Sequence, residues 1–278
     1  MFKILNWRLF LEKVGNLSIS NKDSYIEGMN KTLIDKSFFM DKLNYDVIVD
    51  FGCADGSLLE YVSKINPSIK IIGYDLDKDM LSKAKSKLGE DALITDDWDE
   101  VVSSIQYYEK PLLNLSSVIH EVYSYSNSNV IKSFWENQVF GGDFLWVVIR
   151  DMIPSVRLGK KDISKFKDDV RNVKMKSDKK YLDSFENRWG TISNNYRTFI
   201  HYLLKYRFIE NWEREVNENY LPVSIETVIN KIPSDYKIVY QDRFVLPFLK
   251  KQVKKDFNID LFNPTHAKMI IKNNKFRK

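Results

Sequence analysis

The chain has 278 residues, of which 44% are hydrophobic, and its formal net charge is +5. This length allows one large α/β domain or two small ones, and this apolar fraction excludes a generally disordered chain. Because Cys53 is the only cysteine, no disulfide can form within the chain, which favours a reducing, cytoplasmic setting.

Residues 1–45 predict helices that pack on the edge of the domain that follows. The apolar side chains Phe2, Leu5, Leu9 and Val14 recur at near-helical spacing. A membrane-surface anchor is the alternative use of such an amphipathic helix. No segment of the sequence approaches the roughly 18 apolar residues that a membrane-spanning helix requires, so we expect no membrane partner.

Predicted strands and helices alternate between residues 46 and 151. The strands are short, rich in β-branched residues and bounded by turn residues, and the helices show apolar side chains at three- and four-residue spacing. The predicted strands are 46–51, 70–75, 92–95, 111–117 and 143–149, and the clearest helices are 57–65 and 77–88. This alternation predicts a cofactor-binding α/β core over 46–151, with a parallel sheet covered by helices on both faces.

The rhythm breaks after residue 151. The segment 152–210 is charged and has few large apolar clusters, which predicts a partly helical, mobile insertion that acts as a cap or substrate-recognition segment. A helix is expected from Tyr196 to Glu215. Residues 211–278 are expected to complete the core with strands at 236–240 and 267–271.

The turn from Asp50 to Gly56 joins the first strand to the first helix. Gly52 and Gly56 let the backbone turn sharply and approach a ligand closely. The helix that follows offers unpaired N–H groups and the positive end of its dipole. Such a turn alone is a weak signal, because it binds a dinucleotide, another ligand or nothing.

Acidic residues at the ends of the next two strands strengthen the case for a nucleoside. Asp75 ends the second strand, where a carboxylate can accept hydrogen bonds from both ribose hydroxyls. Asp96 or Asp97 follows the third strand and can accept from an adenine amino group, while Trp98 can cover the ring. All these residues lie at carboxyl ends of parallel strands, where open α/β sheets bind ligands.

This pattern resembles the class I S-adenosylmethionine-dependent methyltransferases over residues 25–151 and the last two strands. The family's first motif, an acid followed by alternate glycines, matches Asp50, Gly52 and Gly56, and Ala54 replaces the middle glycine at a small expected cost in space. The resemblance implies a doubly wound, mostly parallel seven-stranded sheet with an antiparallel last strand and a helical insertion after the fifth strand. It also implies S-adenosylmethionine as cofactor.

The expected cofactor site combines the residues of the turn with those at the strand ends. Its members are Asp50, Gly52, Cys53, Ala54, Gly56, Asp75, Leu76, Asp96, Asp97, Trp98 and Ser116. A nicotinamide-dependent oxidoreductase is the main alternative, but its G-x-G-x-x-G fingerprint does not match this turn. A non-catalytic adaptor on the same fold is the third reading.

Candidate catalytic residues follow the fourth strand. His120 and Glu121 are suited to proton transfer, since a histidine titrates near neutral pH, and Tyr123 could line a substrate pocket. The structural alternative is a helix start capped by Ser117, with Tyr123 packed in a core. A dedicated base is not obligatory, because positioning can suffice. No metal site is predicted.

Charge is distributed unevenly, and this bears on the methyl acceptor. Residues 46–143 carry a net charge of −9, whereas 155–180 carry +6 and 248–278 carry +7. The two basic segments suit RNA or another nucleic acid, which they would bind through phosphates. A small molecule enclosed under a lid is the alternative acceptor. The sequence does not choose between them and leaves the oligomeric state open.

Overall fold

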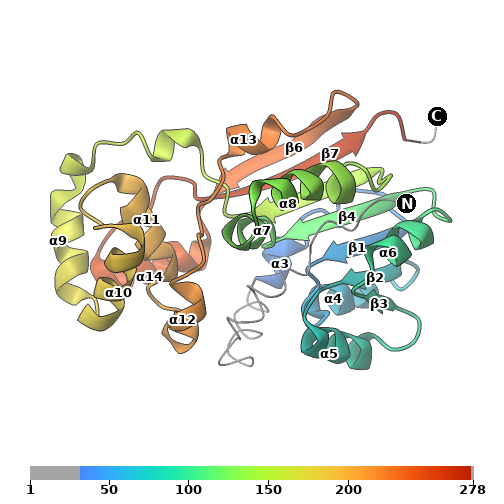
Figure 1. Ribbon diagram of the computed structural model, residues 1–278, viewed down its shortest axis with the longest axis horizontal. Coiled ribbons are helices and arrows are strands. Elements are labelled where there is room, and N and C mark those ends of the chain that lie inside the picture. The colour runs from blue at the N-terminus through green and yellow to red at the C-terminus, as the bar shows by residue number, and fades with distance from the viewer. Residues whose placement is uncertain (1–31, 277–278) are drawn as a thin grey trace.

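The computed structural model describes residues 32–276, so the helix predicted between Phe2 and Val14 lies outside the described residues (Figure 1). A seven-stranded sheet stands beside a lobe made of helices. The strands are β1 Val47–Phe51, β2 Lys70–Tyr74, β3 Leu93–Thr95, β4 Pro111–Ser116, β5 Trp146–Asp151, β6 Tyr236–Phe244 and β7 His266–Asn273.

The strand order is β3-β2-β1-β4-β5-β7-β6. Strands β1 to β5 pair in parallel, and β7 runs antiparallel to both of its neighbours, β5 and β6. The predicted mostly parallel, doubly wound sheet with an antiparallel last strand is therefore confirmed. Its order reverses between β1 and β4, and such a switch point opens a crevice at the carboxyl ends of the strands.

Helices cover both faces of the sheet (Figure 1). The predicted helix 57–65 is present as α4, and α5 begins after Asp77, whose carboxylate accepts from the amides of Asp79 and Met80. Gly89, at φ +74°, ends α5. The helices of the sheet lobe are α3 Leu33–Lys36, α4 Ser57–Ile65, α5 Lys78–Leu88, α6 Trp98–Ile105, α7 Ile119–Tyr125, α8 Ser128–Ser133, the π-helix η1 Phe134–Val139 and α13 Ile225–Ile229.

The side chains of β1 show how the two faces are built. Ile48 packs with Leu59 and Val62 of α4 in one buried cluster. Val47 and Val49 point to the opposite face, into the cluster that includes residues of α6, α7 and α13. Burying each such side chain stabilises the fold by about 1.5–3 kcal/mol, so both faces of the central strand hold the sheet to its helices.

The helical lobe is built from two passes of the chain. The first pass runs between β5 and β6, and the second lies between β6 and β7. Its elements are η2 Val156–Leu158, η3 Ile163–Phe166, α9 Lys167–Lys176, α10 Lys179–Trp189, α11 Tyr196–Lys205, η4 Ile209–Asn211, α12 Trp212–Glu215 and α14 Pro247–Phe257. A separate apolar core, which includes Val173, Phe185, Leu203 and Val253, holds both passes together.

The structure corrects one sequence expectation for this lobe, the extent of the helix that begins at Tyr196. The apolar residues of the 152–210 segment form few clusters along the sequence, but they are spread over several helices and meet in one core in the fold. The predicted helix from Tyr196 to Glu215 breaks after Lys205, because the buried Lys205 Nζ donates to the carbonyl of Glu215. A continuous helix would hold residues 205 and 215 about 15 Å apart. Pro247 begins α14, at a helix start that tolerates its missing N–H group.

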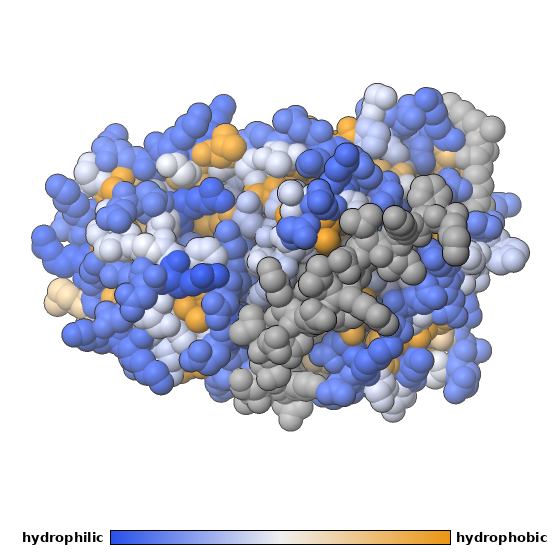
Figure 2. Space-filling view, in the orientation of Figure 1, coloured by the Kyte–Doolittle hydropathy of each residue, from blue (hydrophilic) through white to orange (hydrophobic). Residues whose placement is uncertain are grey.

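The surface seen in Figure 2 is hydrophilic over most of the helical lobe, with small, separate apolar spots. Between residues 32 and 276, no helix combines the length and the hydrophobicity that crossing a bilayer would demand. Exposed apolar side chains in the described part of the chain include Met175 and Phe262.

Candidate functional site

The turn after β1 has the backbone conformation that the sequence predicted. Gly52 and Gly56 adopt φ values of +78° and +75°. The amides of Gly52 and Cys53 both donate to the carbonyl of Tyr74, at 2.7 and 3.0 Å. The turn is therefore anchored to the end of β2, next to Asp75.

Ala54 stands where the motif that the sequence resembles has its middle glycine. The cost of this replacement is a strained backbone conformation rather than the space that the Cβ takes up. The φ of Ala54 is +47°, in the left-handed region that residues with a Cβ avoid. Gly52, in contrast, has no room to spare, because a Cβ there would lie 3.0 Å from Cγ2 of Val118. The glycine turn thus approaches the start of α7 closely.

Asp55 occupies the start of α4. Its carboxylate accepts from the Ser57 amide at 3.2 Å and from the Ser57 hydroxyl at 2.8 Å, and it forms an ion pair with Lys87. Side-chain hydrogen bonds from Ser57 and Lys87 outweigh the effect of burial and lower the pKa of Asp55. This end of the helix already holds a carboxylate, so it is less available to an anionic ligand than the sequence suggested.

Asp75 links the turn to the end of β2. Its Oδ2 accepts from the Ala54 amide at 2.8 Å, and its Oδ1 accepts from the amides of Leu76 and Asp77 at 2.7 and 2.9 Å. Burial raises the pKa of this half-buried carboxyl group, while the amides oppose the shift. A carboxylate offers about four acceptor sites, so Oδ2 keeps capacity for a ligand hydroxyl.

The residues after β3 differ from one another in their surroundings. Asp96 is exposed and forms an ion pair with Lys78, and the side-chain hydrogen bond from that lysine lowers its pKa. Asp97 caps α6 by accepting from the Asp99 amide at 2.9 Å. Trp98 packs edge-on against the aromatic rings of β1 and β2, and its buried Nε1 finds no hydrogen-bond partner between residues 32 and 276. Of these, Asp97 and Trp98 are held in place by local structure.

A buried polar group lies at the switch point itself. Asn114 Nδ2 of β4 donates to Asp50 Oδ1 of β1 at 2.7 Å. Burial raises the pKa of Asp50 to about 7, and burial also lowers the pKa of nearby Lys36 to about 8. Among the described residues, Asn114 Oδ1 and Ser116 Oγ are buried without hydrogen-bond partners. Cys53 is buried beside this group, and its thiol pKa is raised by burial.

The start of α7 is capped by a residue that sequence reasoning did not assign to it. Asp151 Oδ2, at the end of β5, accepts from the Ile119 amide at 2.6 Å. Ser117, the predicted cap, adopts φ +61°, and its hydroxyl accepts from Arg150 Nη1 at 2.9 Å instead. Strand β5 therefore fixes the position of the helix that carries the candidate catalytic residues.

His120 is held between two carboxylates. Its Nδ1 lies 2.6 Å from Asp151 Oδ1, and its Nε2 lies 2.9 Å from Glu218 Oε1. Burial acts to lower the pKa of His120, but the charges and hydrogen bonds of Asp151 and Glu218 raise it well above 6.5. In this arrangement both ring nitrogens carry protons, so the ring has no free lone pair with which to accept another.

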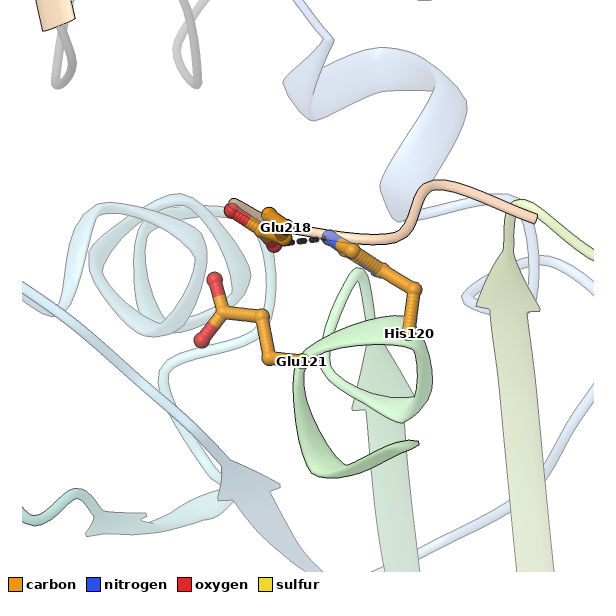
Figure 3. Close-up of side chains that lie close together, drawn as sticks. All are labelled: His120, Glu121 and Glu218. Atoms are coloured by element: carbon orange, nitrogen blue, oxygen red, sulfur yellow. Dashed lines mark ion pairs between the residues drawn. The ribbon is translucent and has the colours of Figure 1, made fainter. Parts of the chain in front are cut away.

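Glu121 and Glu218 point toward the same space as His120 (Figure 3). Glu121 Oε1 accepts from Arg214 Nη2 at 2.9 Å, and burial raises the pKa of Glu121. Tyr123 is not part of this group, because its hydroxyl accepts from the indole of Trp135 at 3.0 Å within the apolar core. The structure thus brings together two of the three predicted catalytic residues.

Sequence reasoning missed the partners that complete this cluster. Glu218 and Arg214 come from the end of the first pass through the helical lobe, far along the chain from α7. No local pattern marks either residue, since each becomes part of the site only when the lobe folds onto the sheet. The role of Asp151 as the cap of α7 was not predicted from the sequence either.

No family model and no curated protein sequence matches the chain. Solved structures do resemble it. The plantazolicin methyltransferase BpumL in complex with SAH is 13% identical over 98% of this chain and 92% of its own, with a TM-score of 0.48. The methyltransferase domain of bacterial CtHen1 is 14% identical over 86% of this chain and 96% of its own, with a TM-score of 0.41. At these identities and TM-scores, the similarity carries no conclusion about the ligands of this chain.

Proposed function

We propose that this protein is an S-adenosylmethionine-dependent methyltransferase. The observation that carries the proposal is the hydrogen bond from the Ala54 amide to Asp75 Oδ2 at 2.8 Å. It joins the glycine turn of β1 to the acidic end of β2, beside the switch point where sheets of this kind bind ligands. The sequence motif and the antiparallel β7 agree with what the resemblance to this family implies.

In this proposal the two ends of the cofactor meet different strands. Asp75 would accept from the ribose hydroxyls through its remaining acceptor capacity. Asp97, already fixed at the start of α6, would accept from the adenine amino group, with Trp98 beside the ring. The methionine part would lie over the turn near Asp50 and Ser116, which are buried at the switch point.

The start of α4 argues against the oxidoreductase alternative. A dinucleotide places its pyrophosphate on the amides at a helix start. Here the Asp55 carboxylate already accepts from the Ser57 amide, and it would repel a phosphate. S-adenosylmethionine has no phosphate, so it avoids this conflict.

Calorimetry on variants of Asp75 tests the proposal. The parent protein should bind S-adenosylmethionine or S-adenosylhomocysteine, and Asp75→Ala should weaken binding by about 1.5–3 kcal/mol, the usual worth of a hydrogen bond to a charged group. The exposed Asp91→Asn serves as the matched control and should bind like the parent. Binding of a nicotinamide dinucleotide but of neither adenosyl compound would reject the assignment.

For the acceptor we propose a nucleic acid, with the basic part of the helical lobe as its contact surface. Lys160, Lys161, Lys165 and Lys167 are all exposed, as phosphate contacts must be. They lie on the lobe that follows β5, whereas the acidic sheet lobe would repel a polyanion.

A salt series tests this surface. Replacing the four lysines with glutamine should weaken RNA binding and flatten its salt slope by roughly 0.7–0.9 per lost contact. Replacing the exposed Lys83 and Lys85 of the sheet lobe, which removes half as much charge, is the control for location and should change little. If the four-lysine variant binds RNA as the parent does across the series, the small-molecule acceptor becomes the better reading.

A further inference from the structure

The cluster of His120, Glu121 and Glu218 has the composition and the geometry of a metal site (Figure 3). One donor atom from each residue lies within 4.8 Å of the other two. Divalent first-row transition metal ions bind imidazole nitrogen and carboxylate oxygen at about 2.0–2.2 Å. Small side-chain rotations would bring all three donor atoms to this distance from one ion. We propose that this cluster binds a divalent first-row transition metal ion, although the sequence alone predicts no metal.

A second observation supports a ligand role for the imidazole. A histidine that binds a metal through one nitrogen usually donates its other N–H to a carboxylate, which fixes the tautomer and the ring orientation. Asp151 Oδ1 lies 2.6 Å from His120 Nδ1, which leaves Nε2 as the nitrogen that faces the cluster. Asp151 is fully buried and is itself held by the Ile119 amide, so the support is rigid.

Charges in the cluster can accommodate the ion. In the metal-free arrangement a proton on Nε2 of His120 bridges to Glu218 Oε1 at 2.9 Å. A bound ion would take the place of that proton, which leaves to solvent, and Glu218 would then bind the metal in place of the N–H. Arg214 pairs with Oε1 of Glu121, and the second oxygen of that carboxylate remains for the metal.

The donor set favours some ions over others. One imidazole and two carboxylates suit Mn²⁺, Fe²⁺ or Zn²⁺, whereas Ca²⁺ and Mg²⁺ prefer oxygen ligands alone and Cu⁺ prefers sulfur. The residues come from two parts of the molecule, since α7 belongs to the sheet lobe and Glu218 to the first pass of the helical lobe. A bound ion would therefore also fasten the lobes together.

The position of the site suggests what the metal would do. Val118 packs against Gly52 of the glycine turn, and His120 follows two residues later. If the proposed methyltransferase function holds, on which this step alone rests, the ion lies at the edge of the sheet where an acceptor must meet the cofactor. It would position an acceptor that carries oxygen or nitrogen lone pairs.

Titration of the metal-depleted full chain with Mn²⁺, followed by calorimetry and by electron paramagnetic resonance of the free ion, tests the proposal. One ion should bind per chain, and Glu218→Gln should weaken binding at least tenfold. Glu213→Gln, an exposed glutamate on the neighbouring α12, is the matched control and should bind like the parent. Asp151→Asn should weaken binding about 10–100-fold, as supporting carboxylates do.

Folding and function are separated by further measurements. Thermal unfolding identifies any variant that fails to fold. If Glu218→Gln does not fold, Glu121→Gln is used in its place to test the ligand role of the cluster. If the parent binds neither Mn²⁺ nor Zn²⁺, or if folded Glu218→Gln and Glu121→Gln variants bind like the parent, the cluster is an ion-pair network and the proposal is overturned. Binding of S-adenosylmethionine is measured on the same samples, so metal binding without cofactor binding rejects only the proposed function.

Discussion

The sheet and the helical lobe bury similar kinds of side chains but assemble their cores differently. In the sheet, short apolar runs such as Val47–Phe51 form strands. Consecutive side chains of each strand point to opposite faces of the sheet. In the helical lobe, the core gathers small groups of residues from many separate helices, from Leu158 to Leu261. A core made of contiguous runs can be found in a sequence, whereas a core made of scattered residues exists only in the fold.

The two regions also differ in the surroundings of their buried charged groups. Lys205 of the helical lobe is fully buried, and it donates to the carbonyls of Glu215 and Glu218. Its surroundings are those of a structural group. In the sheet lobe, Asp50 lies at the switch point beside Asn114, whose Oδ1 is buried without a partner. Since buried polar groups are usually hydrogen-bonded, a ligand at the switch point could satisfy this atom.

The largest effect is expected at Lys205. Lys205→Ala should lower the free energy of unfolding by about 3–5 kcal/mol, because it removes a buried charged group and leaves a cavity and two carbonyls without their donor. Chemical denaturation measures the loss. If the two cores are separable, hydrogen exchange should accelerate in α11 and α12 before it does in β1.

A second variant distinguishes charge from packing at that position. Lys205→Met fills most of the space but supplies no donor. It should lower the free energy of unfolding by only about 1–3 kcal/mol, the cost of leaving the carbonyls unpaired, and so by less than Lys205→Ala. Equal losses of stability for both variants would show that filling the cavity contributes little and that the missing donor accounts for the loss. Unchanged stability in either variant would contradict the structural role of the buried ammonium group.

Asp50 should make the sheet lobe sensitive to pH. Its folded-state pKa of about 7 lies above the value in the unfolded chain, so its contribution to stability is fully present below about pH 4 and is lost as pH rises through 7. Asp50→Asn cannot ionise. The variant should therefore gain stability relative to the parent as pH rises from 4 to 8, by at most about 4 kcal/mol at 1.4 kcal/mol per unit of pKa.

Denaturation at several pH values follows this difference. The exposed Asp91→Asn is the control, and its stability relative to the parent should stay flat over the same interval. A flat difference for Asp50→Asn as well would mean that the buried carboxyl group does not take up a proton near neutral pH.

The same contrast explains what the sequence could and could not predict. The turn at Gly52, the acid at Asp75 and the start of α5 at Asp77 follow from local patterns, and the structure places them where those patterns indicate. The break after Lys205 and the arrival of Glu218 at His120 depend on contacts between distant segments. Local propensity carries no information about such contacts.

The smallest effect, of about 0.5–1 kcal/mol, is expected in the glycine turn after β1, where two substitutions should act in opposite directions. Ala54→Gly should stabilise the protein, because φ is +47° there and glycine adopts this conformation without strain. Gly52→Ala should destabilise it by more, since it combines φ +78° with a contact of 3.0 Å to Val118. Thermal denaturation measures both changes, and Gly89→Ala, at φ +74° with open space around it, isolates the backbone term from the contact. Destabilisation by Ala54→Gly would mean that the turn gains from a restrained Ala54, whose amide donates to Asp75, more than it loses to strain.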